Sequence, residues 1–172
     1  MTPRLGYALG LLACLGLLAF ALYLQYVEHQ EPCPLCILQR IAFLSMMGVF
    51  LVGVLHGPKR TGALAYSGIA IVIAALGGGV AARHVWLQHL PAEQVPACGP
   101  GLQYMLERFG LMQSLGKILA GSGECAEVGW TFLGLSIAAW SLVWFVLIAV
   151  YALVVALRAP RRAASNPQRS RG

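Results

Sequence analysis

Four long apolar stretches constrain the fold of this chain more than any other feature of the sequence. They run from Leu5 to about Val27, from Ile37 to His56, from Ala63 to Ala82, and from Trp130 to Leu157. A helix needs about 20 apolar residues to cross a bilayer core of ~30 Å. Only 10% of the 172 residues are charged, whereas a soluble domain carries roughly a quarter. The sequence therefore predicts an all-α membrane protein, a four-transmembrane-helix bundle with one long outward loop.

The first stretch has an alternative interpretation as a secretory signal peptide, because Arg4 precedes the apolar run. The apolar region of a signal peptide spans roughly 7 to 15 residues and leads to a cleavage site with small side chains. Here the run is longer and ends in Gln25, Tyr26 and Glu28 without such a site. A retained membrane span is therefore the favoured interpretation.

Charged residues are distributed unequally between the two sides of such a bundle. The basic residues that fall on one side, without any acidic residue, are Arg4, Lys59, Arg60, Arg158, Arg161, Arg162, Arg169 and Arg171. The acidic residues all fall on the other side and are Glu28, Glu31, Glu93, Glu107, Glu124 and Glu127. By the positive-inside rule, both termini and the loop near Pro58 then face the cytoplasm. The basic tail, 158–172, is expected to be disordered and held at the anionic lipid surface, which argues against a nucleic-acid partner.

The two predicted outward loops, about 28–36 and 83–129, differ in length. Even the longer loop is too small to bury a core of its own. Within it, residues 101–119 place apolar side chains at helical spacing, which predicts a short helix in the membrane interface; packing onto the helix ends is the alternative. Residues 1–157 are thus expected to form one membrane domain, and the glycines at 77–79 indicate a close helix contact or a kink.

The five cysteines are sorted by this topology. Cys14 falls in the middle of the first span, where a cysteine acts as a small hydrophobic residue. The others fall on the outward side, where disulfides form and persist; they are Cys33, Cys36, Cys98 and Cys125. A zinc site commonly uses two close cysteine pairs, and a c-type haem needs CxxCH, where this chain has Ile37. No metal is therefore expected.

The motif Cys33-Pro-Leu-Cys36 closes too short a loop to stabilise the fold as a disulfide, and its spacing is typical of a redox-active pair. Cys33 falls near the N-cap of a helix, with Pro34 at the first helical position. Unpaired N–H groups at a helix N-terminus favour an anion, here a thiolate. A Cys98–Cys125 disulfide would close a longer loop, so a structural role for that pair stays open.

Arg40 lies four residues after Cys36, one turn along on the same helix face. A cation at this depth normally has a partner, and the Cys36 thiolate or an electron-rich ligand would serve; snorkelling to the headgroups is the alternative. His84 closes the third stretch at the same membrane face, where an interfacial anchor is the simpler interpretation. The sequence shows no iron–sulfur cysteine set and no Gly-rich dinucleotide loop, so elimination favours a lipid-soluble quinone as electron acceptor.

Several segments carry a resemblance to one family. They are "CPLCILQR", "RHVWLQHLP", "PAC" and "GSGECAEVGWTFLGLS". Over nearly its whole length except the arginine-rich tail, the chain resembles the disulfide bond formation protein B (DsbB) family, the inner-membrane thiol:quinone oxidoreductases of Gram-negative bacteria. The resemblance implies that Cys33 and Cys36 pass electrons to ubiquinone, or to menaquinone under anaerobic conditions. It further implies that the Cys36 thiolate contacts the quinone ring, that Arg40 assists quinone binding, and that His84 lines the quinone pocket.

The resemblance also implies that Cys98 and Cys125 oxidise a periplasmic partner, a thioredoxin-fold thiol oxidase of the DsbA type. In the family scheme the partner thiolate attacks Cys98, and the released Cys125 attacks Cys33. Electrons then reach the membrane quinone pool, and disulfides are generated de novo. An acidic residue can stand beside the arginine in this family, so no proton-handling role is transferred to Gln39.

Two other functions stay open at this point. One is a related enzyme, either a vitamin K epoxide reductase-like protein or a DsbB paralogue with a dedicated substrate. The other is a non-catalytic membrane scaffold whose outer loops carry inert disulfides. A scaffold predicts that Cys33 and Cys36 can be replaced without loss of function, whereas an enzyme predicts that reduced partner accumulates in either single mutant.

Overall fold

The computed structural model describes residues 3–95, 116, 118–119, 121 and 123–159. Cys98, most of the expected interfacial helix at 101–119, and nearly all of the basic tail lie outside these residues.

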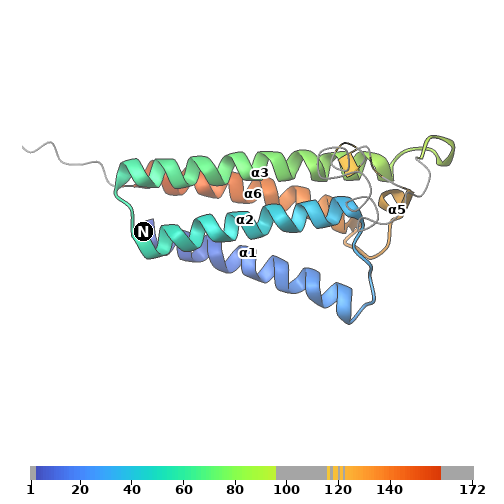
Figure 1. Ribbon diagram of the computed structural model, residues 1–172, viewed down its shortest axis with the longest axis horizontal. Helices are drawn as coiled ribbons and strands as arrows, with labels where there is room; N and C mark the ends of the chain where they lie inside the picture. Colours follow the sequence, from blue (N-terminus) through green and yellow to red (C-terminus); the bar gives the residue numbers. More distant parts are fainter. Residues whose placement is uncertain (1–2, 96–115, 117, 120, 122, 160–172) are drawn as a thin grey trace, which may run out of the picture.

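Four long helices form an up-and-down bundle (Figure 1). They are α1 (Pro3–Tyr26), α2 (Pro34–His56), α3 (Arg60–Gln88) and α6 (Ile137–Arg158). Each is long and apolar enough to cross a membrane, so the predicted four-span helical bundle is confirmed. Figure 1 shows α3 and α6 side by side along their length, while α1 diverges from α2 toward the point where α2 begins. Shorter elements are η1 (Ala92–Gln94), α5 (Gly123–Ala126), β1 (Thr131–Phe132) and β2 (Leu135–Ser136).

The two ends of the bundle are called here the turn end and the cysteine end. The turn end holds the α2–α3 connection around Gly57, and the cysteine end holds the start of α2, the last turns of α3, and α5. Gly57 has φ 56° and closes α2 by donating its N–H to the Gly53 carbonyl, a left-handed cap that favours glycine. A Cβ at Gly57 would collide with the guanidinium of Arg4. The Arg4 side chain thus lies against the α2–α3 connection at the turn end.

The core of the bundle is tightly packed in its middle. The rings of Phe43 on α2 and Phe145 on α6 stack with centroids 4.2 Å apart. Gly77 on α3 lies against both neighbours, because an added Cβ would be 2.9 Å from the Ala42 Cβ and would overlap the Phe145 ring. Small residues let membrane helices approach in this way, so the glycine run marks a close helix contact at Gly77. Cys14 is 0% exposed within this apolar core, as expected of a small hydrophobic residue.

The third helix is longer than its apolar stretch. It continues past Ala82 to Gln88, so Arg83 and His84 belong to α3 rather than to a loop. The added turns alternate in exposure, with His84 and Leu87 buried and Trp86 exposed. The buried side chains thus keep helical spacing beyond Ala82, although the overall hydropathy falls there. Because the prediction used hydropathy, it ended the apolar stretch at Ala82.

The fourth helix begins later than predicted, at Ile137 rather than at Trp130. Residues 131–136 instead form an antiparallel hairpin in which Thr131 pairs with Ser136 and Phe132 with Leu135. Its two turn residues, Leu133 and Gly134, have φ values of 53° and 77°, as a tight two-residue hairpin turn requires. Ser136 then caps α6, since its Oγ accepts the Ala139 N–H at 3.3 Å.

Candidate active site

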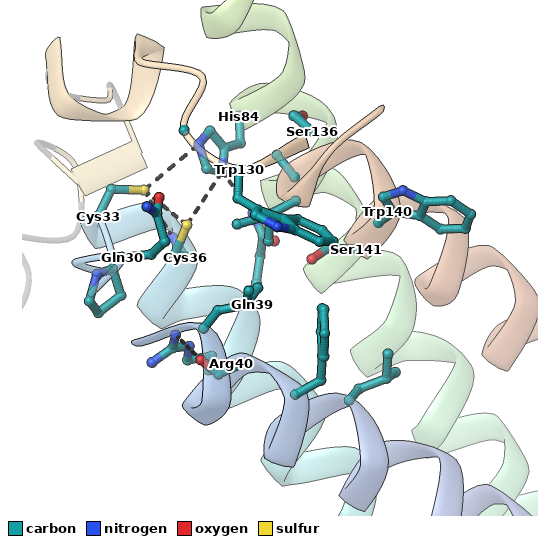
Figure 2. Close-up of a pocket in the computed structure, with 18 of the residues that line it drawn as sticks. Gln30, Cys33, Cys36, Gln39, Arg40, His84, Trp130, Ser136, Trp140 and Ser141 are labelled. Atoms are coloured by element: carbon teal, nitrogen blue, oxygen red, sulfur yellow. Dashed lines mark hydrogen bonds between the residues drawn. The ribbon is translucent and has the colours of Figure 1, made fainter. Parts of the chain in front are cut away.

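Cys33 and Cys36 form a close dithiol at the start of α2 (Figure 2). Cys33 is the N-cap, and its sulfur accepts the Cys36 backbone N–H at 3.4 Å. Pro34 follows at the first helical position, where its missing N–H costs nothing. The two Sγ atoms are 3.2 Å apart, with the Cys33 thiol donating to the Cys36 sulfur. Helix capping thus brings the two sulfurs together, in the arrangement that the motif predicted.

His84 reaches the same dithiol from α3. Its Nε2 lies 3.7 Å from Cys33 Sγ, and its Nδ1 lies 4.0 Å from Cys36 Sγ. The side chain is only 3% exposed, so it is not an interfacial anchor in contact with lipid headgroups. The extension of α3 past Ala82 is what carries His84 to this position.

Gln39 is a member of the site to which the sequence assigned no role. Its side chain is 3% exposed, and its amide Nε2 lies 3.2 Å from His84 Nδ1. Gln39 follows Cys36 by one helical turn, so it lies on the same face of α2. That register was the available signal, since a glutamine facing the bundle interior needs a hydrogen-bond partner.

Arg40 lies beside the dithiol but bonds elsewhere. Its Nη1 donates to Gln25 Oε1, and its Nη2 donates to the Ala21 carbonyl at 3.0 Å. Both acceptors belong to α1, so the guanidinium links α1 to α2 at the cysteine end. The guanidinium thus donates its hydrogen bonds to neutral acceptors of α1 and also interacts electrostatically with Cys36, one of the partners expected from the sequence.

Cys125 joins the dithiol from α5. It is 0% exposed and packs in one apolar cluster with Cys33, Leu87 and Ile118. The backbone of Cys125 also approaches the His84 ring. The structure therefore brings together three of the four cysteines expected at the site, while Cys98 lies outside the described residues.

A cavity of about 510 Å³ opens beside Cys36, between α1, α2, α6 and the hairpin. Its wall is largely apolar and aromatic, and the aromatic members are Phe20, Phe43, Trp130, Phe132, Trp140 and Trp144. Polar and charged side chains also line the cavity, among them Cys33, Cys36, Gln39, Arg40 and His84 of the dithiol site and the carboxylates of Glu31, Glu124 and Glu127. Small-molecule sites are typically of this size, with an apolar wall and a few polar groups that orient the ligand.

The hairpin forms part of this wall and was not predicted. Phe132 stacks on Trp130 with ring centroids 5.8 Å apart, and Trp130 meets Phe20 of α1 edge-on at 5.7 Å. Trp140 of α6 donates its indole N–H to the Phe132 carbonyl at 3.0 Å. The alternation of Trp130 and Phe132, followed by Gly134, was the sequence signal for a hairpin with one aromatic face.

The same side chains include potential metal ligands. Ligand atoms of Cys33, Cys36 and His84 lie within 4.8 Å of one another. These residue types suit zinc, although a closed structural site uses four protein ligands. Among the described residues, this trio could hold a soft divalent ion only while both thiols are reduced and deprotonated.

Comparison with known proteins identifies the family. A family model for the disulfide bond formation protein DsbB matches residues 3–155. Disulfide bond formation protein B of Nitrosococcus oceani is 52% identical over 153 residues, which cover 89% of this chain and 90% of that protein. The protein of the same name from Hahella chejuensis is 56% identical over 146 residues, covering 85% and 88%. That of Xanthomonas campestris pv. campestris is 46% identical over 162 residues, covering 92% and 94%. The structure has a dithiol at a helix N-terminus, in a bundle of four helices that are long and apolar enough to span a membrane. The chain therefore belongs to the DsbB family, whose multi-pass membrane proteins are oxidoreductases in disulfide bond formation.

Proposed function

We propose that this chain is a thiol:quinone oxidoreductase, which moves two electrons from a reduced periplasmic dithiol partner to a membrane quinone. One observation carries the proposal: the Cys33–Cys36 dithiol borders an apolar, aromatic cavity of about 510 Å³. A dithiol that served only as a structural clip would need no such cavity beside it.

The cavity suits a quinone in shape and polarity. A quinone head is a flat ring with apolar substituents and two carbonyl acceptors, so it fits a largely aromatic wall that also carries hydrogen-bond donors. The Arg40 guanidinium offers donors at the cavity wall, and Cys36 and His84 line the cavity beside it. When bound, a quinone supplies an acceptor for two electrons and two protons. Ubiquinone and menaquinone both have this chemistry.

The dithiol is the source of those electrons. Oxidation of Cys33 and Cys36 from two thiols to one disulfide releases two electrons and two protons. The thiolate is the reactive form of a cysteine, and Cys36 is the more exposed of the two cysteines that line the cavity. Cys33 is the more enclosed sulfur, at 8% exposed, and faces the apolar cluster that contains Cys125.

Cys125 is positioned to exchange disulfides with Cys33. Attack of the Cys125 thiolate on the Cys33 sulfur of an oxidised pair forms a Cys125–Cys33 bond and releases Cys36 as a thiolate. No net oxidation occurs in that step, because one disulfide replaces another. The packing of Cys125 against Cys33 supports this order of reaction.

Upstream of this exchange we place Cys98 and a thioredoxin-fold oxidase of the DsbA type. Such oxidases have potentials of about −120 mV, so their re-oxidation needs a stronger oxidant, which a respiratory quinone provides. In this scheme the cysteine end faces the periplasm and both termini face the cytoplasm. The grouping of Arg4, Lys59 and Arg60 at the turn end supports this orientation under the positive-inside rule.

The test combines the purified protein with a soluble ubiquinone analogue and a reduced thioredoxin-fold partner, and follows quinone absorbance. We expect quinone loss to match partner oxidation mole for mole, and Cys36→Ser to abolish both. Cys14→Ala is the matched control, because Cys14 lies in the apolar core away from the cavity. Unchanged quinone, with the outward cysteines locked in unreactive disulfides, would support the scaffold hypothesis instead.

A further inference from the structure

Gln39 contacts His84 beside the dithiol, and the inference drawn from this contact rests on the function proposed above. We propose that Gln39 is a positioning residue that sets the direction of a hydrogen-bond chain running from Gln39 through His84 and Cys33 to Cys36. In that direction the hydrogen-bond chain ends on the Cys36 sulfur, so Cys36 holds the negative charge of the reduced pair. Figure 2 shows these four side chains converging from α2 and α3.

The first link fixes the tautomer of His84. The Gln39 Nε2 that lies 3.2 Å from His84 Nδ1 is an amide nitrogen, and an amide nitrogen can only donate. His84 Nδ1 must therefore accept, so a neutral ring carries its proton on Nε2. Cys36 Sγ is a more distant neighbour of Nδ1, at 4.0 Å. Both Gln39 and His84 are 3% exposed, so bulk water does not compete for these groups.

The second and third links follow from that tautomer. The Nε2–H of His84 points to Cys33 Sγ at 3.7 Å, and the backbone N–H of Cys36 also donates to that sulfur at 3.4 Å. With its lone pairs engaged by these two donors, the Cys33 thiol turns its own proton to Cys36 Sγ at 3.2 Å. Each donor thus faces the next acceptor, and the Cys36 sulfur ends the chain as an acceptor.

The direction matters because the two sulfurs differ in burial. Both cysteines line the cavity, but Cys36 is the more exposed of the two, whereas Cys33 is buried in the cluster that holds Cys125. Charge on Cys36 directs the reduced pair toward a cavity ligand, and charge on Cys33 would direct it back toward Cys125. A carboxylate in place of the Gln39 amide accepts and cannot donate, so it would require a proton on Nδ1. A neutral His84 would then accept the Cys33 thiol proton, and a charged one would hold a thiolate at Cys33.

The experiment uses the full-length, quinone-free protein in its reduced form, as wild type and as Gln39→Glu and Gln39→Met. Nitrogen NMR of His84 identifies the protonated ring nitrogen. Limited alkylation followed by fragmentation of the peptide that contains both cysteines reports which sulfur reacts first. In the wild type we expect an unprotonated Nδ1 and preferential alkylation of Cys36. In Gln39→Glu we expect a protonated Nδ1 and a fall of about tenfold in the Cys36:Cys33 ratio, the effect of losing one hydrogen bond to a charged group.

Gln39→Met separates the role of the donor from the effect of charge. It keeps the length of the side chain and removes the hydrogen bond, so both tautomers should be populated and the Cys36:Cys33 ratio should fall by less than in Gln39→Glu. Gln88→Glu is the matched control for charge. Gln88 lines the same cavity one turn beyond His84, but its Oε1 accepts from Ser136 Oγ at 2.7 Å. We expect this variant to leave the His84 tautomer and the alkylation order unchanged.

Three results would overturn the proposal: a protonated Nδ1 in the wild type, first alkylation of Cys33 in the wild type, or a Cys36:Cys33 ratio unchanged in both Gln39 variants. None of these measurements needs quinone or a partner protein. If quinone reduction fails in the wild type while the tautomer and the alkylation order are as expected, the oxidoreductase proposal fails and the role of Gln39 in orienting the chain stands.

Discussion

The two ends of the bundle hold the same helices together in different ways. At the turn end, α1 packs closely: a Cβ on Gly10 would be 3.0 Å from the Phe50 ring, and a Cβ on Gly53 would be 2.8 Å from the Tyr7 ring. The Tyr7 hydroxyl donates to the Ala63 carbonyl at 3.0 Å. At the cysteine end, α1 diverges (Figure 1), and the hydrogen bonds of Arg40 connect it to α2 across the side of a cavity. Small residues and hydrogen-bonded hydroxyls therefore stabilise one end, which lets the other remain open enough to hold a ligand.

The largest expected effect comes from a cysteine-to-serine substitution at the cysteine end, compared with the same substitution in the packed core. Cys33→Ser removes the sulfur that links Cys36 and Cys125, so we expect disulfide generation to fall to background and the reduced partner to accumulate in cells. Cys14→Ser changes the same atom in the packed core and should leave turnover intact. Trapping free thiols with a mass-shifting alkylating reagent measures the reduced partner. A fully oxidised partner in the Cys33→Ser strain would show that the cysteine end has no redox role.

A second prediction tests the packed region. Gly77→Ala places a methyl group where the Phe145 ring and Ala42 already lie. Such overpacking typically costs about 1–3 kcal/mol, which denaturant unfolding in micelles would measure. Gly79→Ala is the control, because nothing lies within 4 Å of an added Cβ there, and it should stabilise the helix by up to about 1 kcal/mol. Equal stability of the two variants would contradict the difference in packing described for this helix.

The third prediction concerns the cysteine end, in the link between α1 and α2. Gln25→Leu removes one acceptor of Arg40, and a hydrogen bond to a charged group is worth about 1.5–3 kcal/mol. Because Arg40 lines the cavity, we expect the KM for a quinone analogue to rise roughly tenfold, with a smaller change in kcat. Steady-state kinetics measures both, and Gln94→Leu, an exposed glutamine outside the cavity lining, serves as control. A KM that does not move would show that Arg40 acts without help from α1.

Hydropathy predicted the bundle well, because each span must satisfy its backbone hydrogen bonds internally in lipid and therefore forms a helix. The ends of the spans were harder to predict. Arg83 and Gln88 lower the local hydropathy, although Leu87 keeps the helical register. Residues from Trp130 are apolar enough to resemble a helix, and only the left-handed turn at Leu133 and Gly134 makes them a hairpin.

The site was predictable where a local pattern determines it. The N-cap position of Cys33 follows from CxxC with proline at a helix start, and the structure has the same arrangement. Contacts between distant segments had no such signal. The meeting of Cys125 with Cys33 depends on how α5 packs against the end of α3, and the partner of Arg40 depends on the axial position of α1. The pairing of Gln39 with His84 is likewise a contact between two helices.

The divergence of α1 also affects how a ligand reaches the cavity. Phe20 belongs to the cavity wall and is 46% exposed, on a helix whose outer surface is apolar enough to lie in lipid. The cavity wall beside α1 therefore reaches the apolar outer surface of the bundle, and we expect a hydrophobic ligand to enter from the bilayer. For a hydrophobic ligand, occupancy then depends on its mole fraction in the bilayer and on its lateral diffusion. Affinities measured with water-soluble analogues would have to be converted through a partition coefficient before they describe the protein in its membrane.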